Sequence, residues 1–496
     1  MDYIPYNILS FRGGLSDENT RGIKGSYKYS YGLNIHKRRD SLSCNWAMLN
    51  VGSTTVVKDL IRYYICAKDG TTYAFGNLGS VYAIAGSQTD PVVTGVYQDE
   101  NGEIKGSAEW KESGGNNYLY WATSTSIARM TLNSSVDTPW AAGVASQNYK
   151  TDLDNYDQHP MKNAVGKLCI GNGNFLATID YDGSYTNAAM NLRPGNIIKC
   201  LEERDDYVII GSERADDSEE GHLWSWTPTA TNWVQKRKVP VKGVNALIDT
   251  ELILLQGGAQ GEIFYSDFVN KAPLNSLPAE LGRTNPMGTA IYNDLALFGF
   301  WGAGDQTGIY SMGRRMQNRP MALNCEFRLD ETVLGNTISE IGAVWVNNSV
   351  PFASYKVTGS ATYYGIDMAS STSRAVALYE GLEFTGGIPH LKKHFVSIKV
   401  VMEKLPTSCS VAILYKTDRA TTSGDQSGSQ KAGWRYARVG GGSGTTYSIV
   451  DSTEAEFIID DKGKTFEIGV ELTPSGTSTP EVTALVGYIS KETEEY

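Results

Sequence analysis

The sequence has few of the residues that build metal and disulfide sites. Six cysteines and five histidines occur in 496 residues, and no two cysteines form a Cys-x-x-Cys pair. Disulfide-stabilised secreted domains are short and rich in cysteine, so we expect free, buried thiols. Only His390 and His394 have a spacing that zinc sites use, and no acidic or cysteine residue accompanies them in the sequence. The sequence therefore predicts neither a disulfide framework nor a metal site.

Long hydrophobic runs are also missing. No window approaches 18 uninterrupted apolar residues, the length of a bilayer-spanning helix, so we expect no transmembrane segment. The first 14 residues lack the basic and apolar regions of a signal peptide. We therefore expect synthesis in a cytoplasm without export by the usual route.

Basic residues are outnumbered by acidic ones, and the net charge is −11. Phosphate recognition requires clustered Lys and Arg. The compact basic runs are 37–39, 236–238 and 314–315, and each is expected to be a solvated turn. No specific nucleic-acid recognition is predicted.

Tyrosine and glycine are abundant, with 29 and 52 residues. Tyrosine favours strands, whereas glycine marks turns and bulges. Helical periodicity is almost absent, with one possible turn near residue 280. These features predict an all-β protein.

An internal repeat of β-hairpins is the most informative pattern. Three segments each contain an apolar run, a tight polar turn and a second apolar run, which is typical of a hairpin. Their turns, at Asp206, Thr250 and Asp294, are 44 positions apart. The segments are 197–212, 244–258 and 288–302. A strand repeat of about 40 to 50 residues is typical of β-propeller blades.

Weaker copies extend the repeat in both directions. They include turns at Asn347-Asn348 and Asn172-Gly173 and the segments 116–132 and 58–76. This predicts a propeller of about seven blades between residues 51 and 385. The repeat is not of the WD40 type, because the sequence contains no Trp-Asp dipeptide.

The pattern changes after Gly386-Gly387. Six apolar alternating segments separated by Gly/Ser/Thr-rich loops predict a β-sandwich or jelly roll over residues 386–496. Residues 1–50 form an N-terminal arm. We expect this arm to close the propeller with a strand added to the last blade, or to pair with a neighbouring subunit's sheet edge.

Catalytic motifs are scarce. The chain has no Gly-x-Ser-x-Gly, no Gly-x-Gly-x-x-Gly after a strand and no His-Glu-x-x-His. Residues 463–465 resemble the end of a P-loop, but Ile458 replaces its first glycine, which favours a turn between strands. Residues 178–183 nearly match a sialidase aspartate box and are expected to form a hairpin loop. Asp152, Asp154 and Asp157 are expected in a solvated loop. We predict no catalytic, cofactor-binding or metal-binding residue and no enzyme activity.

Seven tryptophans are candidates for a sugar-binding groove or for packing between blades. Aromatic residues on alternating strand positions usually pack between neighbouring blades, so packing is favoured. The seven are Trp121, Trp224, Trp226, Trp233, Trp301, Trp345 and Trp434.

Several short sequence motifs along the chain are considered together. Residues 11–46 open with an apolar residue and two glycines, then carry an Asn-apolar phrase, a basic turn and a leucine. The residues are Phe11, Gly13, Gly14, Leu33–His36, Lys37–Asp40 and Ser41-Leu42. Further phrases are Ile263–Asp267 and Val411–Asp418 with Trp434. Together these phrases resemble β-propeller tail proteins of tailed bacteriophages, such as the nozzle or hub proteins of short tails.

The resemblance implies a structural protein of the virion tail, made in the host cytoplasm and assembled in several copies around the tail axis. Its partners would be other tail proteins and copies of itself, and it would need no cofactor. Two alternatives remain open: a propeller that binds a host-surface glycan or receptor, and a sialidase-like glycoside hydrolase with two close carboxylates.

Overall fold

A computed structural model describes most of the chain. The described residues are 3–16, 24–37, 39–52, 56–87, 90–115, 117–132, 146–216, 220–260, 263–266, 275–276, 281–302, 307–314, 319–329, 338–359, 361–420 and 433–491. All regular structure within these ranges is β-strand. The all-β prediction is confirmed.

The middle of the chain folds into seven small antiparallel sheets, counted over the described residues. The first three contain β6 (Ile61–Cys66), β7 (Thr72–Gly76), β8 (Ser80–Ser87) and β9 (Asp90–Gln98); β10 (Gly106–Lys111), β11 (Asn117–Ala122), β12 (Ile127–Thr131) and β13 (Ser146–Lys150); and β14 (Met161–Ala164), β15 (Lys167–Asn172), β16 (Phe175–Ile179) and β17 (Tyr185–Asn191).

The next two contain β18 (Asn196–Arg204), β19 (Tyr207–Arg214), β20 (Gly221–Trp226) and β21 (Gln235–Val239); and β22 (Val244–Asp249), β23 (Ile253–Gly257), β24 (Ile263–Ser266) and β25 (Asn275–Ser276). The sixth contains β26 (Gly282–Arg283), β27 (Thr289–Tyr292), β28 (Leu295–Gly302), β29 (Gly308–Gly313) and β30 (Ala322–Phe327). The seventh contains β31 (Ile338–Asn347), β32 (Val350–Thr358), β33 (Thr362–Arg374) and β5 (Trp46–Gly52).

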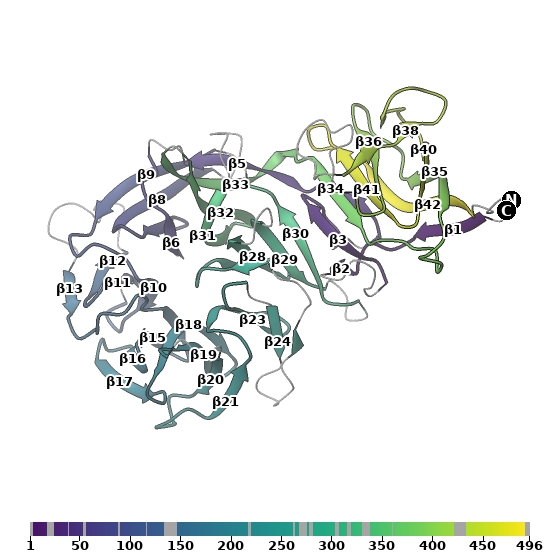
Figure 1. Cartoon of the computed structure of the whole chain (residues 1–496). Coiled ribbons are helices and arrows are strands. Elements are labelled where there is room, and N and C mark those ends of the chain that lie inside the picture. Colours follow the sequence, from purple (N-terminus) through teal and green to yellow (C-terminus); the bar gives the residue numbers. More distant parts are fainter. Residues whose placement is uncertain are drawn as a thin grey trace. The chain divides into compact units, whose positions relative to one another are not determined.

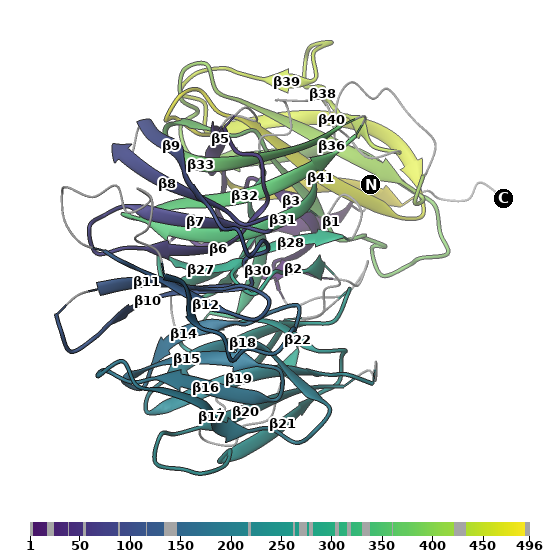
Figure 2. The ribbon, with the colours of Figure 1, turned by 90° about the vertical axis from the view of Figure 1, so that its left-hand side faces the viewer.

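The innermost strands of these sheets form a closed ring. In chain order β6, β10, β14, β18, β22, β27 and β31 are successive neighbours, and β31 lies next to β6. Figure 1 shows the sheets arranged around a common centre, and Figure 2 shows β14–β17 beside β18–β21. This is the arrangement of a β-propeller with seven blades.

The outermost strand of the seventh blade comes from the N-terminal side of the first blade in the sequence. Strand β5, from the N-terminal region, pairs with β33 beyond β31 and β32. The first and last parts of the ring are thereby held by backbone hydrogen bonds. The prediction that the N-terminal arm adds a strand to the last blade is confirmed.

The predicted hairpins form, with three differences of detail. The turn after β15 occupies Gly173 and Asn174, one position later than predicted. In the 116–132 and 165–180 segments the hairpin joins the second and third strands of its blade, β11–β12 and β15–β16, and not the first two. The turn after β31 occupies Asn348 and Ser349, one position later than predicted. Both residues have positive φ, 49° and 65°, as the tight turn requires.

The propeller has hydrophobic clusters between successive blades. One cluster joins β6–β8 to β11 and β12 through Phe75 and Trp121, and another joins β15 and β16 to β18–β20 through Leu176, Ile210 and Trp224. Clusters of the same kind join the seventh blade to the first, the second to the third and the fourth to the fifth. Burial between blades therefore holds the ring together.

Two larger sheets form the rest of the structure. One has the order β1 (Tyr3–Ile8), β42 (Glu481–Lys491), β35 (Lys393–Met402), β40 (Glu454–Gly463) and β38 (Arg438–Val439), with β4 (Leu42–Ser43) also paired to β42. The other has the order β2 (Gly14–Leu15), β3 (Ser26–Tyr31), β34 (Ala377–Gly381), β41 (Phe466–Thr473), β36 (Ser410–Thr417) and β37 (Arg435–Tyr436), with β39 (Thr446–Tyr447) also paired to β36.

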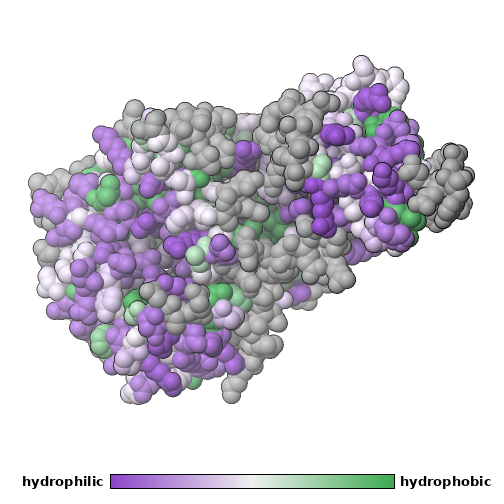
Figure 3. All heavy atoms as spheres, in the orientation of Figure 1, coloured by the Kyte–Doolittle hydropathy of each residue, from purple (hydrophilic) through white to green (hydrophobic). Residues whose placement is uncertain are grey.

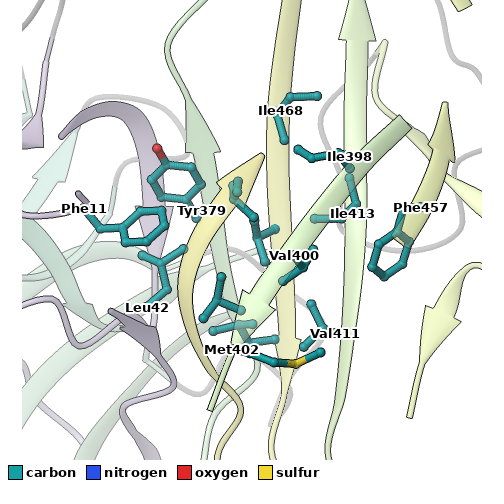
Figure 4. Close-up of a cluster of buried hydrophobic side chains, with 14 of the residues drawn as sticks. Phe11, Leu42, Tyr379, Ile398, Val400, Met402, Val411, Ile413, Phe457 and Ile468 are labelled. Carbon is teal, nitrogen blue, oxygen red and sulfur yellow. The ribbon is translucent and has the colours of Figure 1, made fainter. Parts of the chain in front are cut away.

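These two sheets share one hydrophobic core, as in a β-sandwich. Phe395 of the first sheet and Phe466 of the second meet edge to face, with ring centroids 5.2 Å apart. Figure 4 shows side chains from both sheets converging, among them Ile398 and Ile413. Phe11 and Leu42, from the N-terminal region, belong to the same core.

The chain divides into two compact units that are discontinuous in sequence. The sandwich unit comprises residues 1–48, 309–329 and 369–496, and the propeller unit comprises 49–308 and 330–368. The sandwich unit thus includes β30 and nearly all of β29, although both strands pair within the sixth sheet. The predicted division into 1–50, 51–385 and 386–496 is contiguous. The difference arises because N-terminal strands pair with β42 and β34, which lie far along the chain.

Candidate functional site

Five of the seven candidate tryptophans are buried and so unavailable to line a sugar groove. Each is 2% exposed or less: Trp121, Trp224, Trp226, Trp345 and Trp434. The first four belong to the clusters between blades, which agrees with the packing interpretation. Trp233 packs on Trp224 with ring centroids 5.2 Å apart. Trp301 lines a cavity.

The acidic candidates occupy turns and loops. Asp180 and Asp182 lie in the turn between β16 and β17, where Gly183 N donates to Asp180 O at 2.9 Å. Lys167 forms an ion pair with Asp180. The side chains of Asp152, Asp154 and Asp157 are exposed. Within the described ranges, no group of three or more His, Cys, Asp or Glu could hold a metal ion.

The P-loop-like residues 463–465 lie at the end of β40 and in the turn before β41, as expected. Asp418 Oδ1 accepts hydrogen bonds from Lys464 N at 2.6 Å and Thr465 N at 3.1 Å. A carboxylate thus occupies the backbone donors that a phosphate would need. The turn prediction for this segment is confirmed.

Three smaller expectations need correction. His394 does have acidic company, because Asp460 of β40 lies 2.6 Å from its Nε2. Cys66 is exposed, whereas the other five cysteines are buried, and all six are free. Residues 236–238 belong to β21 and not to a turn. The basic runs 37–39 and 314–315 include residues outside the described ranges.

Residues from several blades line two cavities. The innermost strands β6, β14, β18, β22 and β27 provide most of the lining of one cavity, whereas strand ends and loops provide most of the lining of the other. The first, which we call the Tyr63 cavity, has a volume of about 300 Å³ and is lined by Tyr63, Tyr64, Pro160, Met161, Lys162, Cys200, Leu201, Glu202, Leu247, Ile248, Asp249, Pro286, Met287, Thr289, Ala290 and Ile291.

Charges at the Tyr63 cavity are balanced by ion pairs. Lys162 Nζ lies 2.6 Å from Glu202 Oε1, and Arg204 Nη1 lies 2.6 Å from Asp249 Oδ1. Burial raises the pKa of Asp249, and Arg204 opposes that rise. Burial also raises the pKa of the Cys200 thiol, which keeps it protonated and unreactive.

The second cavity, the Arg283 cavity, is more polar and has a volume of about 460 Å³. It is lined by Gln158, Ile197, Lys199, Glu213, Arg214, Ala215, Lys242, Asn245, Gly258, Ala259, Arg283, Thr284, Asn285, Pro286 and Trp301. Four of these side chains are cationic and one is a carboxylate. Since the whole chain carries a net charge of −11, this concentration of positive charge is local.

A buried amide behind the Arg283 cavity was missed in the sequence. Gln256 is fully buried, and its Oε1 accepts hydrogen bonds from Asn245 Nδ2 at 2.9 Å and Thr284 N at 3.0 Å. Its Nε2 donates to Gly282 O at 3.0 Å. The signal was present, because Gln256 is the single polar residue that ends the apolar run of β23.

Comparisons with known proteins find β-propeller domains among the similar solved structures and do not identify a family. No protein-family model and no curated protein matches the sequence. Similar solved structures include the WD40 β-propeller domain of Doa1 (11% identity, 66% of this chain and 97% of that chain covered, TM-score 0.45) and the RRP9 WD40 repeats (11%, 66% and 99%, TM-score 0.46). The Cps50 (Swd1) β-propeller domain of Myceliophteria thermophila has 12% identity, 66% and 99% coverage and a TM-score of 0.40.

At these identities and TM-scores no residue role transfers to this chain. The assignment of seven blades rests on the order of its own sheets. In the described part of the chain no helix is long and apolar enough to cross a membrane.

Proposed function

We propose that this protein is a structural component of a bacteriophage virion tail, present in several copies as a scaffold for protein–protein contacts. The proposal depends on one observation: residues 11–46, which contain the motifs that resemble tail proteins, contribute side chains to the core of the sandwich unit. Phe11, Leu33 and Leu42 are all fully buried in its core. The positions that resemble tail proteins are therefore positions that the fold of this unit constrains.

Steric and backbone constraints explain why residues 13 and 14, in the first of these motifs, are glycines. A Cβ on Gly13 would lie 2.2 Å from Ser26 N, closer than any real contact, and Gly14 has a φ of 75°. Gly13 N also donates to Gly25 O at 3.0 Å. No other residue fits Gly13, so this glycine of the resembling segment is required by the local backbone.

The remaining phrases also lie on core strands. Residues 263–266 form β24, the third strand of its blade, and residues 411–417 belong to β36. Trp434 is buried at 2% exposure, and a Cβ on Gly469 would lie 3.4 Å from its ring. These placements support the resemblance at the level of strand packing.

The surface favours polar contacts with partners. On the face that Figure 3 shows, the coloured residues are mostly hydrophilic and hydrophobic ones are scattered. The exposed large hydrophobic residues are dispersed along the sequence, from Leu9 to Tyr488. The outer strands β17 and β21 present mainly polar or small side chains, such as Thr186, Asn187 and Lys236. Contacts with copies or tail proteins would then be polar or would pair strand edges.

The proposal is tested by the location and stoichiometry of the chain. We expect quantitative mass spectrometry of purified phage particles to find it at a fixed small copy number, and immunogold labelling to place it at the tail. Light scattering of the isolated chain measures whether it assembles without the particle. A chain absent from particles contradicts the proposal, and so does one that cleaves glycans.

A further inference from the structure

Buried polar atoms at the Arg283 cavity have no hydrogen-bond partner. Trp301 Nε1, Thr284 Oγ1 and Gln158 Oε1 are all unsatisfied, and all three residues line the cavity. Thr284 is only 3% exposed. Because buried polar groups in native structures nearly always have partners, atoms of this kind around one cavity indicate that a polar molecule completes their hydrogen bonds.

The cationic side chains of the cavity differ in whether a carboxylate neutralises their charge. Lys199 Nζ lies 3.1 Å from Glu213 Oε1, and Arg214 Nε donates to Asp216 at 3.0 Å. The guanidinium of Arg283 lies 5.8 Å from the centroid of the Trp301 ring. In the described part of the chain, no carboxylate lies within ion-pair distance of Arg283. Its charge is therefore the one most available to an anion.

The wall that carries these groups is preorganised. Gln256 fixes the backbone on both sides of Arg283, since it donates to Gly282 O and accepts from Thr284 N. Asn285 Nδ2 donates to Ile341 O at 2.6 Å and ties the next residue to the neighbouring blade. A ligand would therefore meet donors that are already in place, at a small cost in ordering.

We infer that the Arg283 cavity binds a small ligand through an oxyanion, a phosphate or a carboxylate. Arg283 pairs with the oxyanion, and the Thr284 hydroxyl and the Trp301 indole N–H donate to oxygens of the ligand. The cavity volume of about 460 Å³ falls in the range of small-molecule sites, roughly 300 to 1,000 Å³. Phosphorylated and carboxylated molecules share this chemistry.

Calorimetric titration of the full chain tests the inference. The probes are inorganic phosphate, glucose 6-phosphate, citrate and, as the uncharged reference, glucose. We expect at least one anion to bind at one site per chain and glucose not to bind. The ratio of the citrate and glucose 6-phosphate affinities then tells which oxyanion the site prefers.

Three variants locate the binding. R283Q should weaken it at least about tenfold, because a charge-assisted hydrogen bond is lost. T284V, which keeps the shape of the wall, and W301F, which removes the indole N–H and part of the ring, should weaken it roughly three- to tenfold each. K238Q removes an exposed charge outside the cavity and should leave binding unchanged. Circular dichroism confirms that each variant is folded.

Two results overturn the inference. In one, none of the anions binds the folded chain at millimolar concentration, which would mean that water alone fills the cavity. In the other, an anion binds but R283Q and T284V bind as well as the unsubstituted chain, or K238Q weakens binding equally. Either form of the second result would place the anion elsewhere on the surface.

Discussion

The two compact units bury their apolar side chains in different ways. In the propeller unit the described core is split into clusters, each shared by two successive blades. In the sandwich unit one cluster draws on strands from residue 6 to residue 489. A propeller can thus be assembled from equivalent local pieces, whereas the sandwich requires strands from distant parts of the chain at once.

The buried polar side chains of the two units also differ in how far along the sequence their hydrogen-bond partners lie. In the sandwich unit Asn324 accepts hydrogen bonds from Tyr27 at 2.8 Å and Ser30 at 3.0 Å, and donates to Leu33 O at 2.7 Å. This amide ties the N-terminal region to β30. In the propeller unit the corresponding buried amide, Gln256, bonds to residues of its own and the next blade.

The largest expected effect comes from removing one buried aromatic ring from the core of each unit. W345A removes a ring that stacks on Phe352 at 5.4 Å in the propeller, and F457A removes a fully buried ring in the sandwich. Each should cost about 3–5 kcal/mol of unfolding free energy. Hydrogen exchange followed by peptide should show W345A increasing exchange mainly in the seventh and first blades, and F457A throughout the sandwich core. Equal spread in both variants would contradict the contrast.

The buried amide of the sandwich unit gives the next effect. N324A leaves the Tyr27 and Ser30 hydroxyls and the Leu33 carbonyl without this partner, at a cost of about 3 kcal/mol. Chemical denaturation measures the loss. The control N187A removes an exposed amide from β17 and should change stability by less than about 0.5 kcal/mol. A cost as small as that of the control would mean that the network does not hold the N-terminal region.

A pH-dependent effect should be specific to the propeller. Burial lowers the pKa of His222 to about 4, and its Nδ1 has no partner. The unfolded chain binds this proton near pH 6.5, so between pH 6.5 and 4 the native state binds fewer protons and stability falls by about 2–3 kcal/mol. H222Q should reduce this fall in denaturation curves recorded across that range, whereas H390Q, at an exposed site, should not. Identical pH profiles for H222Q and the unsubstituted chain would refute the assignment.

The smallest effects come from matched turn substitutions. Ser349 in the propeller and Ser408 in the sandwich unit have φ values of 65° and 61° and are exposed. Glycine adopts such angles without strain, so S349G and S408G should each stabilise their unit by about 0.5–1 kcal/mol. Thermal denaturation measures the gain. Destabilisation by either variant would show that the serine side chain contributes more than the backbone strain costs.

Much of the fold was accessible from local pattern. The 44-residue spacing of the turns at Asp206, Thr250 and Asp294 predicted the blades, because apolar alternation and tight turns are properties of adjacent residues. The burial of Trp121 and Trp345 between blades followed from the same alternation. The Arg283 cavity was not predicted, since its cations come from several blades and none forms a motif with its sequence neighbours.

The sequence by itself therefore determined an all-β chain with hairpins at blade spacing and a strand-rich C-terminal region. Only the tertiary structure decided which strand of the N-terminal region completes the seventh blade, that N-terminal strands share a core with β42, and that Arg283, Thr284 and Trp301 surround one cavity. The physical reason is distance along the chain. Hairpins form between neighbours, whereas the closing strand β5 and the shared sandwich core bring together residues hundreds of positions apart, and the Arg283 cavity combines residues from Gln158 to Trp301.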